Sequence, residues 1–191
     1  MKALKIIIFV IVMGTVSSAL LVGVNSFTLP KVTKNEELRL KSAVLDALEI
    51  PYDKINIIAI FDSKVKTIKA DNKVFYRSSD GSVAFEFIGP GLWGPIKGIA
   101  SVNSDLKTIK IIKILYQEET PGLGARIAEM GFLKQFRGKE FLPKLVFMPA
   151  GKSSAKNEVD AITGATGSSR ALERLLNETL NKNVGLLQKS D

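Results

Sequence analysis

Residues 160–169 read Asp-Ala-Ile-Thr-Gly-Ala-Thr-Gly-Ser-Ser and stand directly before the last helical pattern of the chain. In that pattern apolar residues recur three and four positions apart, at Ala171, Leu172, Leu175, Leu176 and Leu180. Small and hydroxylated residues before such a helix can cap its free N–H groups or bind an anion there. On physical grounds alone, capping is the simpler interpretation, and an anion site is the alternative.

The same stretch resembles the flavinylation motif of FMN-binding domains, Asp-x-x-(Ser/Thr)-Gly-x-(Ser/Thr). In that family the last hydroxyl residue carries FMN through a phosphoester bond, and the matching residue here is Thr166. A helix N-terminus behind Thr166 would stabilise the remaining phosphate charge by about 0.3–1 kcal/mol. The resemblance implies that the cofactor also lies against Thr163, Gly164, Ala165 and Ser169.

Residues 119–124, Glu-Thr-Pro-Gly-Leu-Gly, form a second motif. Proline followed by glycine indicates a tight turn, and a plain turn between a strand and a helix is the simpler interpretation. The hexapeptide also resembles the Thr-Pro-Gly-Leu-Gly loop of the same family, which lies along the flavin ring. That role is thereby implied for Thr120, Gly122, Leu123 and Gly124.

Residues 89–95 are rich in glycine and proline and contain Trp93, the only tryptophan of the chain. The composition predicts a rigid turn, with the indole packed on the core. The family has a similar Gly-Leu-Trp segment near its flavin. The resemblance therefore makes Trp93 a candidate contact to the ring.

Most of the chain after its N-terminal segment resembles this family, and in particular the G subunit of Rnf electron-transport complexes. The C subunit of the sodium-pumping NADH:quinone reductase is a longer relative. The resemblance implies an electron relay between ferredoxin and NAD that is coupled to ion transport, with the other Rnf subunits as partners. It also implies a separate flavin transferase for maturation. A stand-alone anchored flavin carrier and a cofactor-free anchored binding module are the alternatives.

Residues 6–24 contain no charge and follow a short basic start. As a helix they would be about 28 Å long, which is close to the thickness of a hydrocarbon core. A cleaved signal peptide and a retained anchor both fit, and the length favours the anchor. We expect residues 1–28 to form a single-pass anchor in the cell membrane and residues 29–191 to form the FMN-binding domain.

Small residues recur every fourth position in the apolar segment, at Thr15, Ala19 and Gly23 and at Gly14 and Ser18. This spacing lets another membrane helix approach closely, although such residues are common in membrane helices. Lysines on both sides of the segment leave its orientation open. Long domains cross membranes despite flanking charge, and the resemblance agrees, so we expect the domain on the extracytoplasmic side.

The remaining pattern predicts an α+β domain with an antiparallel sheet and flanking helices. Residues 33–36 read as a capping box that opens a linking helix over about 34–50. Short β-rich runs separated by turn residues predict strands at 55–62, 65–70, 73–77, 82–88, 96–102, 106–116 and 145–148.

Composition excludes several functions. The chain has no cysteine and no histidine, so it offers no ligands of the usual kind for iron–sulfur clusters or zinc, and no histidine catalysis. Its net charge is +8, but no basic block alternates with aromatic residues, so we do not expect nucleic-acid binding. A solvated surface explains the charge most simply, and anionic lipid or an acidic partner is the alternative. No constellation of acid, base and nucleophile indicates catalysis by the chain alone.

Overall fold

The computed structural model describes residues 2–190, and the chain divides into two compact units. The first unit comprises the residues up to Leu40, and the second comprises those from Lys41 onward. Helix α1 (Lys2–Ala47) contributes to both units. The second unit contains a five-stranded antiparallel sheet and helices, so the predicted α+β fold is confirmed.

The helix α1 passes through residues 33–36 without a break, so the predicted start of a separate linking helix is wrong. The Thr33 hydroxyl donates to the Leu29 carbonyl at 3.0 Å, as an interior helical residue does, and caps nothing. Pro30 lies inside α1 and does not end it. The predicted linking helix is therefore the last part of α1, and it ends at Ala47 rather than near residue 50.

The end of α1 is closed by backbone hydrogen bonds. Glu49 has a φ of 58°, and the Ile50 N–H donates to the Leu45 carbonyl at 2.9 Å, which is a Schellman-type ending. Glycine usually occupies this left-handed position. Here the Glu49 carboxylate pairs with the Arg137 guanidinium at 2.7 and 3.1 Å. The Ser101 hydroxyl of the sheet donates to the Ala47 carbonyl at 2.6 Å, which ties this end of α1 to the domain.

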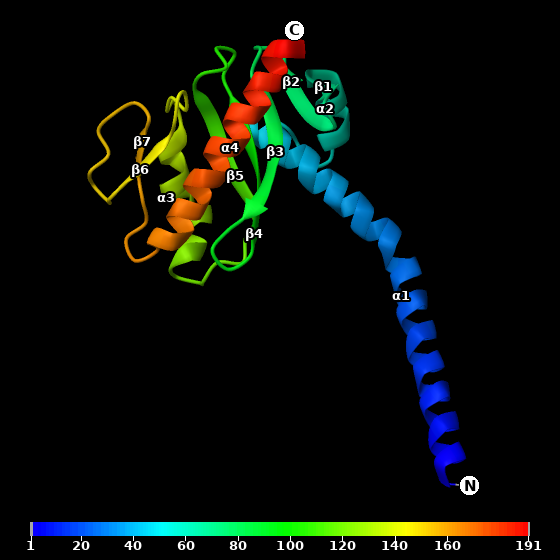
Figure 1. Cartoon of the computed structure of the whole chain (residues 1–191). Helices are drawn as coiled ribbons and strands as arrows, with labels where there is room; N and C mark the ends of the chain where they lie inside the picture. Colours follow the sequence, from blue (N-terminus) through cyan, green and yellow to red (C-terminus); the bar gives the residue numbers. More distant parts are fainter. Residues whose placement is uncertain (1, 191) are drawn as a thin grey trace. The chain divides into compact units, whose positions relative to one another are not determined.

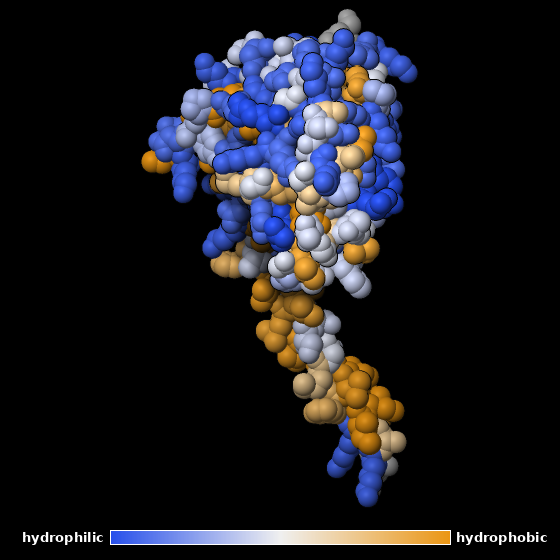
Figure 2. Space-filling view, turned by 90° about the vertical axis from the view of Figure 1, so that its left-hand side faces the viewer, coloured by the Kyte–Doolittle hydropathy of each residue, from blue (hydrophilic) through white to orange (hydrophobic). Residues whose placement is uncertain are grey.

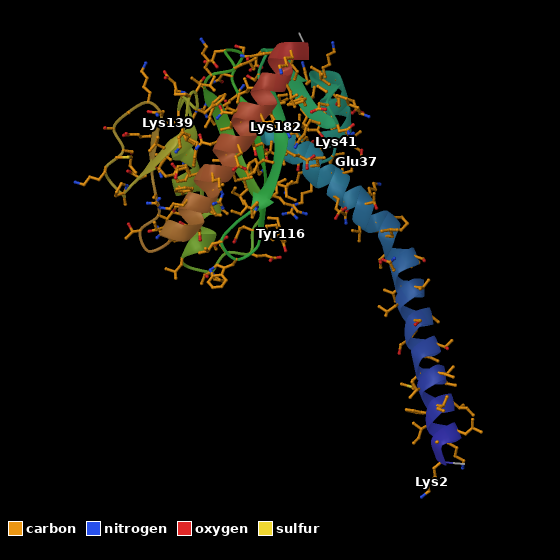
Figure 3. The ribbon with its side chains drawn as sticks, in the orientation of Figure 1. Lys2, Glu37, Lys41, Tyr116, Lys139 and Lys182 are labelled. Carbon is orange, nitrogen blue, oxygen red and sulfur yellow. The ribbon has the colours of Figure 1, made fainter. Side chains whose placement is uncertain are left out.

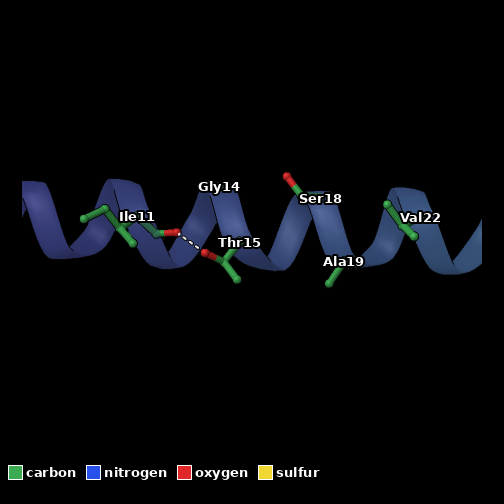
Figure 4. A pocket seen from close by; sticks show the side chains of 6 residues that line it. All are labelled: Ile11, Gly14, Thr15, Ser18, Ala19 and Val22. Atoms are coloured by element: carbon green, nitrogen blue, oxygen red, sulfur yellow. Dashed lines mark hydrogen bonds between the residues drawn. The ribbon is translucent and has the colours of Figure 1, made fainter.

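The N-terminal part of α1 is long and apolar enough to cross a membrane, by length and composition. Its large apolar side chains are exposed along the segment, as Figure 2 shows. A shallow groove on this segment is lined by Ile11, Gly14, Thr15, Ser18, Ala19 and Val22. The Thr15 hydroxyl donates to the Ile11 carbonyl at 2.8 Å, so this polar group is satisfied within the helix (Figure 4).

The sheet is a meander of neighbouring antiparallel strands in the order β1-β2-β3-β4-β5. The strands are β1 (Val65–Ala70), β2 (Lys73–Ser78), β3 (Val83–Pro90), β4 (Pro95–Val102) and β5 (Ile109–Tyr116). The strands predicted over residues 65–116 are confirmed, with β5 starting three residues later than predicted.

The strand predicted at residues 55–62 is wrong, because most of this run lies in helix α2 (Ile57–Lys64). A short apolar run does not distinguish a strand from a helix. The helix buries Phe61, which contacts the Tyr76 ring edge-on at a centroid distance of 5.7 Å. Ile55 remains 88% exposed before the helix starts.

Helix α4 (Thr166–Ser190) runs across the sheet and contacts β3, as Figure 1 shows. Its buried Leu172, Leu176 and Leu180 share one core with Phe85 and Phe87 of β3. A Cβ atom on Gly89 would collide with Leu175 Cδ1, so glycine lets the helix approach the end of β3 closely. The predicted amphipathic helix is thus confirmed.

Short elements connect β5 to α4: η1 (Gly124–Ala128), α3 (Met130–Leu133), η2 (Lys134–Phe136), β6 (Val146–Met148) and β7 (Glu158–Asp160). The parallel pair β6–β7 was predicted only in part, since three-residue β7 carries too little pattern to be detected. The Asn177 amide of α4 holds the start of this pair: it accepts from Leu145 N and donates to Leu145 O, both at 2.8 Å.

We predict that Asn177→Ala destabilises the domain by about 1–3 kcal/mol, because both backbone groups of Leu145 lose their partner. Asn181→Ala is the matched control, since Asn181 is exposed on the same helix and its loss should change stability by less than about 0.5 kcal/mol. Urea unfolding of the full chain in detergent, followed by circular dichroism, measures both. Equal midpoints for the two variants would contradict this role of Asn177.

Candidate functional site

Three segments that are far apart in the sequence meet at the start of α4. They are the tryptophan loop (residues 91–94) between β3 and β4, the proline turn (residues 120–123) after β5, and the threonine turn (residues 161–165). A Cβ atom on Gly167 would lie 2.7 Å from Leu92 Cδ2, and one on Gly164 would lie 3.6 Å from Leu123 Cδ2. Figure 1 shows the three segments at the same end of the domain.

The threonine turn is fixed by its own hydrogen bonds. Gly164 has a φ of +81°, a left-handed conformation that glycine adopts without strain. The Ala165 N–H donates to the Ile162 carbonyl at 3.0 Å, and the Ile162 N–H donates to the Ser169 hydroxyl at 3.1 Å. Ala165 and Ser169 are buried, so the turn is anchored in the core and the first residue of α4, Thr166, is presented to solvent.

The four hydroxyl residues of this stretch therefore divide into two pairs. Ser168 and Ser169 are buried and hydrogen-bonded, whereas Thr163 and Thr166 are exposed. Thr166 lies in the first helical turn, where N–H groups lack partners within the helix and the helix dipole favours negative charge. The geometry thus leaves Thr166 as an accessible hydroxyl at an end of the helix that suits an anion.

A tight turn over residues 120–123 is confirmed. The Leu123 N–H donates to the Thr120 carbonyl at 3.1 Å, and Gly122 has a φ of +74°. Proline at the second position and glycine at the third are typical of a type II turn. Thr120, Gly122 and Leu123 are exposed, and Gly124 is buried where a Cβ would collide with the Ser168 hydroxyl.

Trp93 is 72% exposed, so the prediction that it packs on the core is wrong. The indole lies at the tip of a four-residue loop closed by the Gly91 N–H, which donates to the Gly94 carbonyl at 2.8 Å. Leu92 and Leu123 are also about half exposed, at 54% and 48%. Three large apolar side chains from two loops thus remain accessible at this end of the domain.

A buried carboxylate connects the tryptophan loop and α4 to the start of the proline turn. Glu119 Oε1 accepts from the N–H groups of Leu92 at 2.7 Å and Trp93 at 3.3 Å. Its Oε2 accepts from the Ser168 hydroxyl at 2.5 Å. Glu119 is 4% exposed and follows shortly after Tyr116, which ends β5 and is labelled in Figure 3.

A cavity of about 290 Å³ opens beside Thr166. Its wall includes Thr163, Gly164, Ser169 and Arg170, together with residues 147–150 and 161–162. Arg170 is one helical turn after Thr166, so its guanidinium can reach an anion attached to that hydroxyl. An accessible hydroxyl, a helix N-terminus, an arginine and nearby apolar side chains fit a planar ligand that carries a phosphate.

Asp160 fixes one wall of this cavity. Its Oδ1 accepts from the N–H groups of Lys152 at 3.0 Å and Ser153 at 2.9 Å. The hydrogen bond from the Ser153 backbone is the main cause that holds the pKa of Asp160 below its usual value. The loop that contains Pro149 and Ala150 is thereby closed against the threonine turn, which gives the first residue of the motif a structural role.

Sequence reasoning missed Glu119, Ser168, Leu92 and Arg170 as site residues. Glu119 and Ser168 stand inside the two motifs, but their burial depends on contacts between segments 49 positions apart. Leu92 is adjacent to Trp93, and Arg170 directly follows the motif, one helical turn after Thr166. The position of these residues in or beside the motifs was the only sequence signal for them. Such a position does not show whether a charged side chain is exposed or buried.

Comparisons with known proteins agree on one family. Residues 91–181 match the FMN-binding domain family. The chain is 29% identical to the G subunit of the ion-translocating oxidoreductase complex of Methanosarcina acetivorans over 185 residues, covering 93% of this chain and 92% of that protein. It is 36% identical to the C subunit of the Na(+)-translocating NADH-quinone reductase of Pasteurella multocida over 95 residues, covering 47% of this chain.

The chain matches only 36% of the length of the Pasteurella multocida protein. The fold nevertheless extends further than this alignment. The crystal structure of the C subunit of the Na(+)-translocating NADH-quinone reductase from Parabacteroides distasonis superposes with a TM-score of 0.70 at 25% identity, covering 81% of this chain and 94% of that one.

We predict that Asp160→Ala accelerates amide exchange most at Ser153, whose N–H loses its acceptor, and less at Lys152, whose N–H also donates to the Pro149 carbonyl at 3.0 Å. The pKa of Asp160 is lowered in the folded protein, so its carboxylate stabilises the loop at residues 152–153 fully above the ordinary carboxyl pKa of about 4. This stabilisation of the loop is lost as the pH falls through the lower pKa of the folded state. Hydrogen–deuterium exchange, expressed as protection factors, measures both effects.

Asp105→Ala is the matched control, since Asp105 accepts from Lys107 N and Thr108 N in a turn away from the site. It should free those two amides and leave residues 152–153 protected. Equal protection of residues 152–153 in wild type and Asp160→Ala would contradict the prediction.

Proposed function

Because residues 91–181 match the FMN-binding domain family, we propose that the chain is a membrane-anchored electron-transfer subunit with FMN attached covalently to Thr166. The observation that carries this proposal is that Thr166 is exposed at the first turn of α4, beside a cavity with an arginine in its wall. The neighbouring hydroxyls of Ser168 and Ser169 are buried and already bonded.

Attachment at Thr166 suits the charge of the product. A phosphodiester to a threonine keeps one negative charge, which the N-terminus of α4 stabilises by about 0.3–1 kcal/mol. Arg170 supplies a cation in the wall of the same cavity. Thr163 is also exposed but precedes the helix, so it lacks this position at the first turn.

The apolar side chains around Thr166 suit the flavin ring. Leu123 and Trp93 are exposed on two loops that are held at the start of α4, where they can cover the faces of a planar ring. Thr120 can offer a hydroxyl to the ring edge, and Gly122 lets the turn come close. The bound FMN supplies the redox chemistry, and the residues of the chain hold and orient it.

We place the chain in an Rnf-type complex that moves electrons between ferredoxin and NAD and is coupled to ion transport. The alignment with the Methanosarcina acetivorans protein runs over 92% of that protein, whereas the alignment with the Pasteurella multocida protein runs over 36%. In this arrangement α1 anchors the chain among the other subunits, the domain lies on the extracytoplasmic side, and a separate flavin transferase attaches the FMN.

A stand-alone anchored carrier and a cofactor-free binding module are the alternative functions. The exposed groove of α1 favours the complex over the carrier, because small residues allow a partner helix to pack closely. The exposed Thr166 and its surroundings favour a flavoprotein over a cofactor-free module.

Thr166→Ala should abolish covalent flavin when the chain is co-produced with its transferase, because the attacking hydroxyl is gone. Thr166→Ser should retain part of the signal, and Thr163→Ala is the control that removes the other exposed hydroxyl of the motif. In-gel flavin fluorescence of the denatured proteins measures attachment. A fluorescent Thr166→Ala band of wild-type intensity would show that the site is elsewhere.

Gly14→Leu combined with Ala19→Leu should weaken co-purification of partner subunits, because leucine fills the groove of α1. Membrane insertion should persist, since leucine is more apolar than the residues replaced. Val16→Leu with Val24→Leu is the control, because neither residue lines the groove. Partner recovery that is the same in both double variants would argue against helix packing through this face.

A further inference from the structure

Glu119 is a buried carboxylate whose hydrogen-bond partners at its two oxygens are all donors. Two backbone N–H groups and one hydroxyl donate to these oxygens, and an ionised carboxylate can accept from all three. Within residues 2–190, neither a lysine nor an arginine forms an ion pair with it. A buried charge without a counter-ion needs another source of stabilisation.

That source is the first turn of α4. Ser168, which donates to Glu119, is the third residue of the helix, so the carboxylate lies at the end where the helix dipole favours negative charge. Charge-assisted hydrogen bonds are stronger than neutral ones, and the three donors here come from two different segments. The carboxylate is thus held by the tryptophan loop and by α4 together.

The backbone of two loops lies close to the Glu119 carboxylate. A Cβ atom on Gly91 would collide with Glu119 Oε1, and one on Gly124 would lie 3.0 Å from Glu119 Oε2 and collide with the Ser168 hydroxyl. Glycine at both positions lets the two loops close directly on the carboxylate. These contacts are all made by residues of the chain itself.

We propose that Glu119 is the positioning residue of the flavin site, and that its fixed negative charge lowers the reduction potential of the flavin. This inference rests on the proposed function. The carboxylate holds the loop that presents Leu92 and Trp93, and it lies against the helical turn that begins with the attachment residue. Reduction of a flavin adds an electron, and a negative charge nearby in a site of low dielectric opposes that addition.

Two substitutions separate the role of Glu119 in holding the tryptophan loop from the effect of its negative charge on the flavin. Glu119→Gln keeps the size of the side chain and an oxygen that can accept from Leu92 and Trp93, but it removes the charge. Glu119→Ala removes the acceptor as well. Glu118→Gln is the control, because Glu118 is the neighbouring carboxylate, exposed to solvent, and accepts from the Tyr116 hydroxyl instead.

The first measurement is a redox titration of the full chain in detergent, loaded with FMN by its transferase. Glu119→Gln should raise the equilibrium constant for reduction about tenfold, which corresponds to about 59 mV for one electron. Glu118→Gln should stay at the wild-type potential. A Glu119→Gln potential equal to that of wild type overturns the proposal.

The second measurement uses the chain without flavin. Hydrogen–deuterium exchange at the Leu92 and Trp93 amides should accelerate at least about tenfold in Glu119→Ala and stay near wild type in Glu119→Gln, which keeps an acceptor. If Glu119→Ala does not fold, Ser168→Ala removes the tether to α4 and should accelerate the same amides. Unchanged exchange in the folded variant overturns the positioning role.

The two measurements distinguish an error in the inference about Glu119 from an error in the proposed function. If wild type takes up no flavin, the function is wrong, while amide exchange still tests the role of Glu119 in holding the loop. If wild type is loaded and neither the potential nor the exchange responds, the inference about Glu119 is wrong and the function stands.

Discussion

The site depends on one buried carboxylate that joins the tryptophan loop and α4 to the start of the proline turn. Glu119 receives hydrogen bonds from the tryptophan loop and from Ser168 of α4, and it leads directly into the proline turn. This side chain therefore links the backbone of Leu92 and Trp93 to the start of α4. If Glu119 were absent, the hydrogen bonds that connect the tryptophan loop to Ser168 of α4 would be lost.

The meander and α4 explain why these segments can meet. Neighbouring antiparallel strands put the β3–β4 loop and the exit of β5 at the same end of the sheet. Helix α4 crosses β3, and its Leu175 packs directly against Gly89 near the end of that strand. The N-terminus of α4 therefore lies at the same end of the sheet as the two loops. Packing of the hydrophobic core therefore fixes the site geometry, and the polar contacts of Glu119 and Asp160 refine it.

Much of this could be predicted from local sequence. The turn at residues 120–123, the amphipathic helix behind the threonine motif and the strands of the meander follow from short patterns that each carry their own physical signal. The wrong or missing predictions concern residues whose secondary structure or burial is determined by tertiary contacts. Phe61 contacts the Tyr76 ring from a helix where a strand was predicted, and α1 continues through Thr33. Trp93 is exposed to solvent, whereas Glu119 is buried and bonded to Ser168 of α4.

The most direct test of the central claim is peptide mapping by mass spectrometry of the protein purified from its native membrane. Cleavage after Lys156 and Arg170 yields a peptide that holds all four hydroxyls of the motif. Fragmentation should place an FMN phosphodiester on Thr166 and leave Thr163, Ser168 and Ser169 unmodified. An unmodified peptide, or flavin on one of the other hydroxyls, would contradict a site built around Thr166.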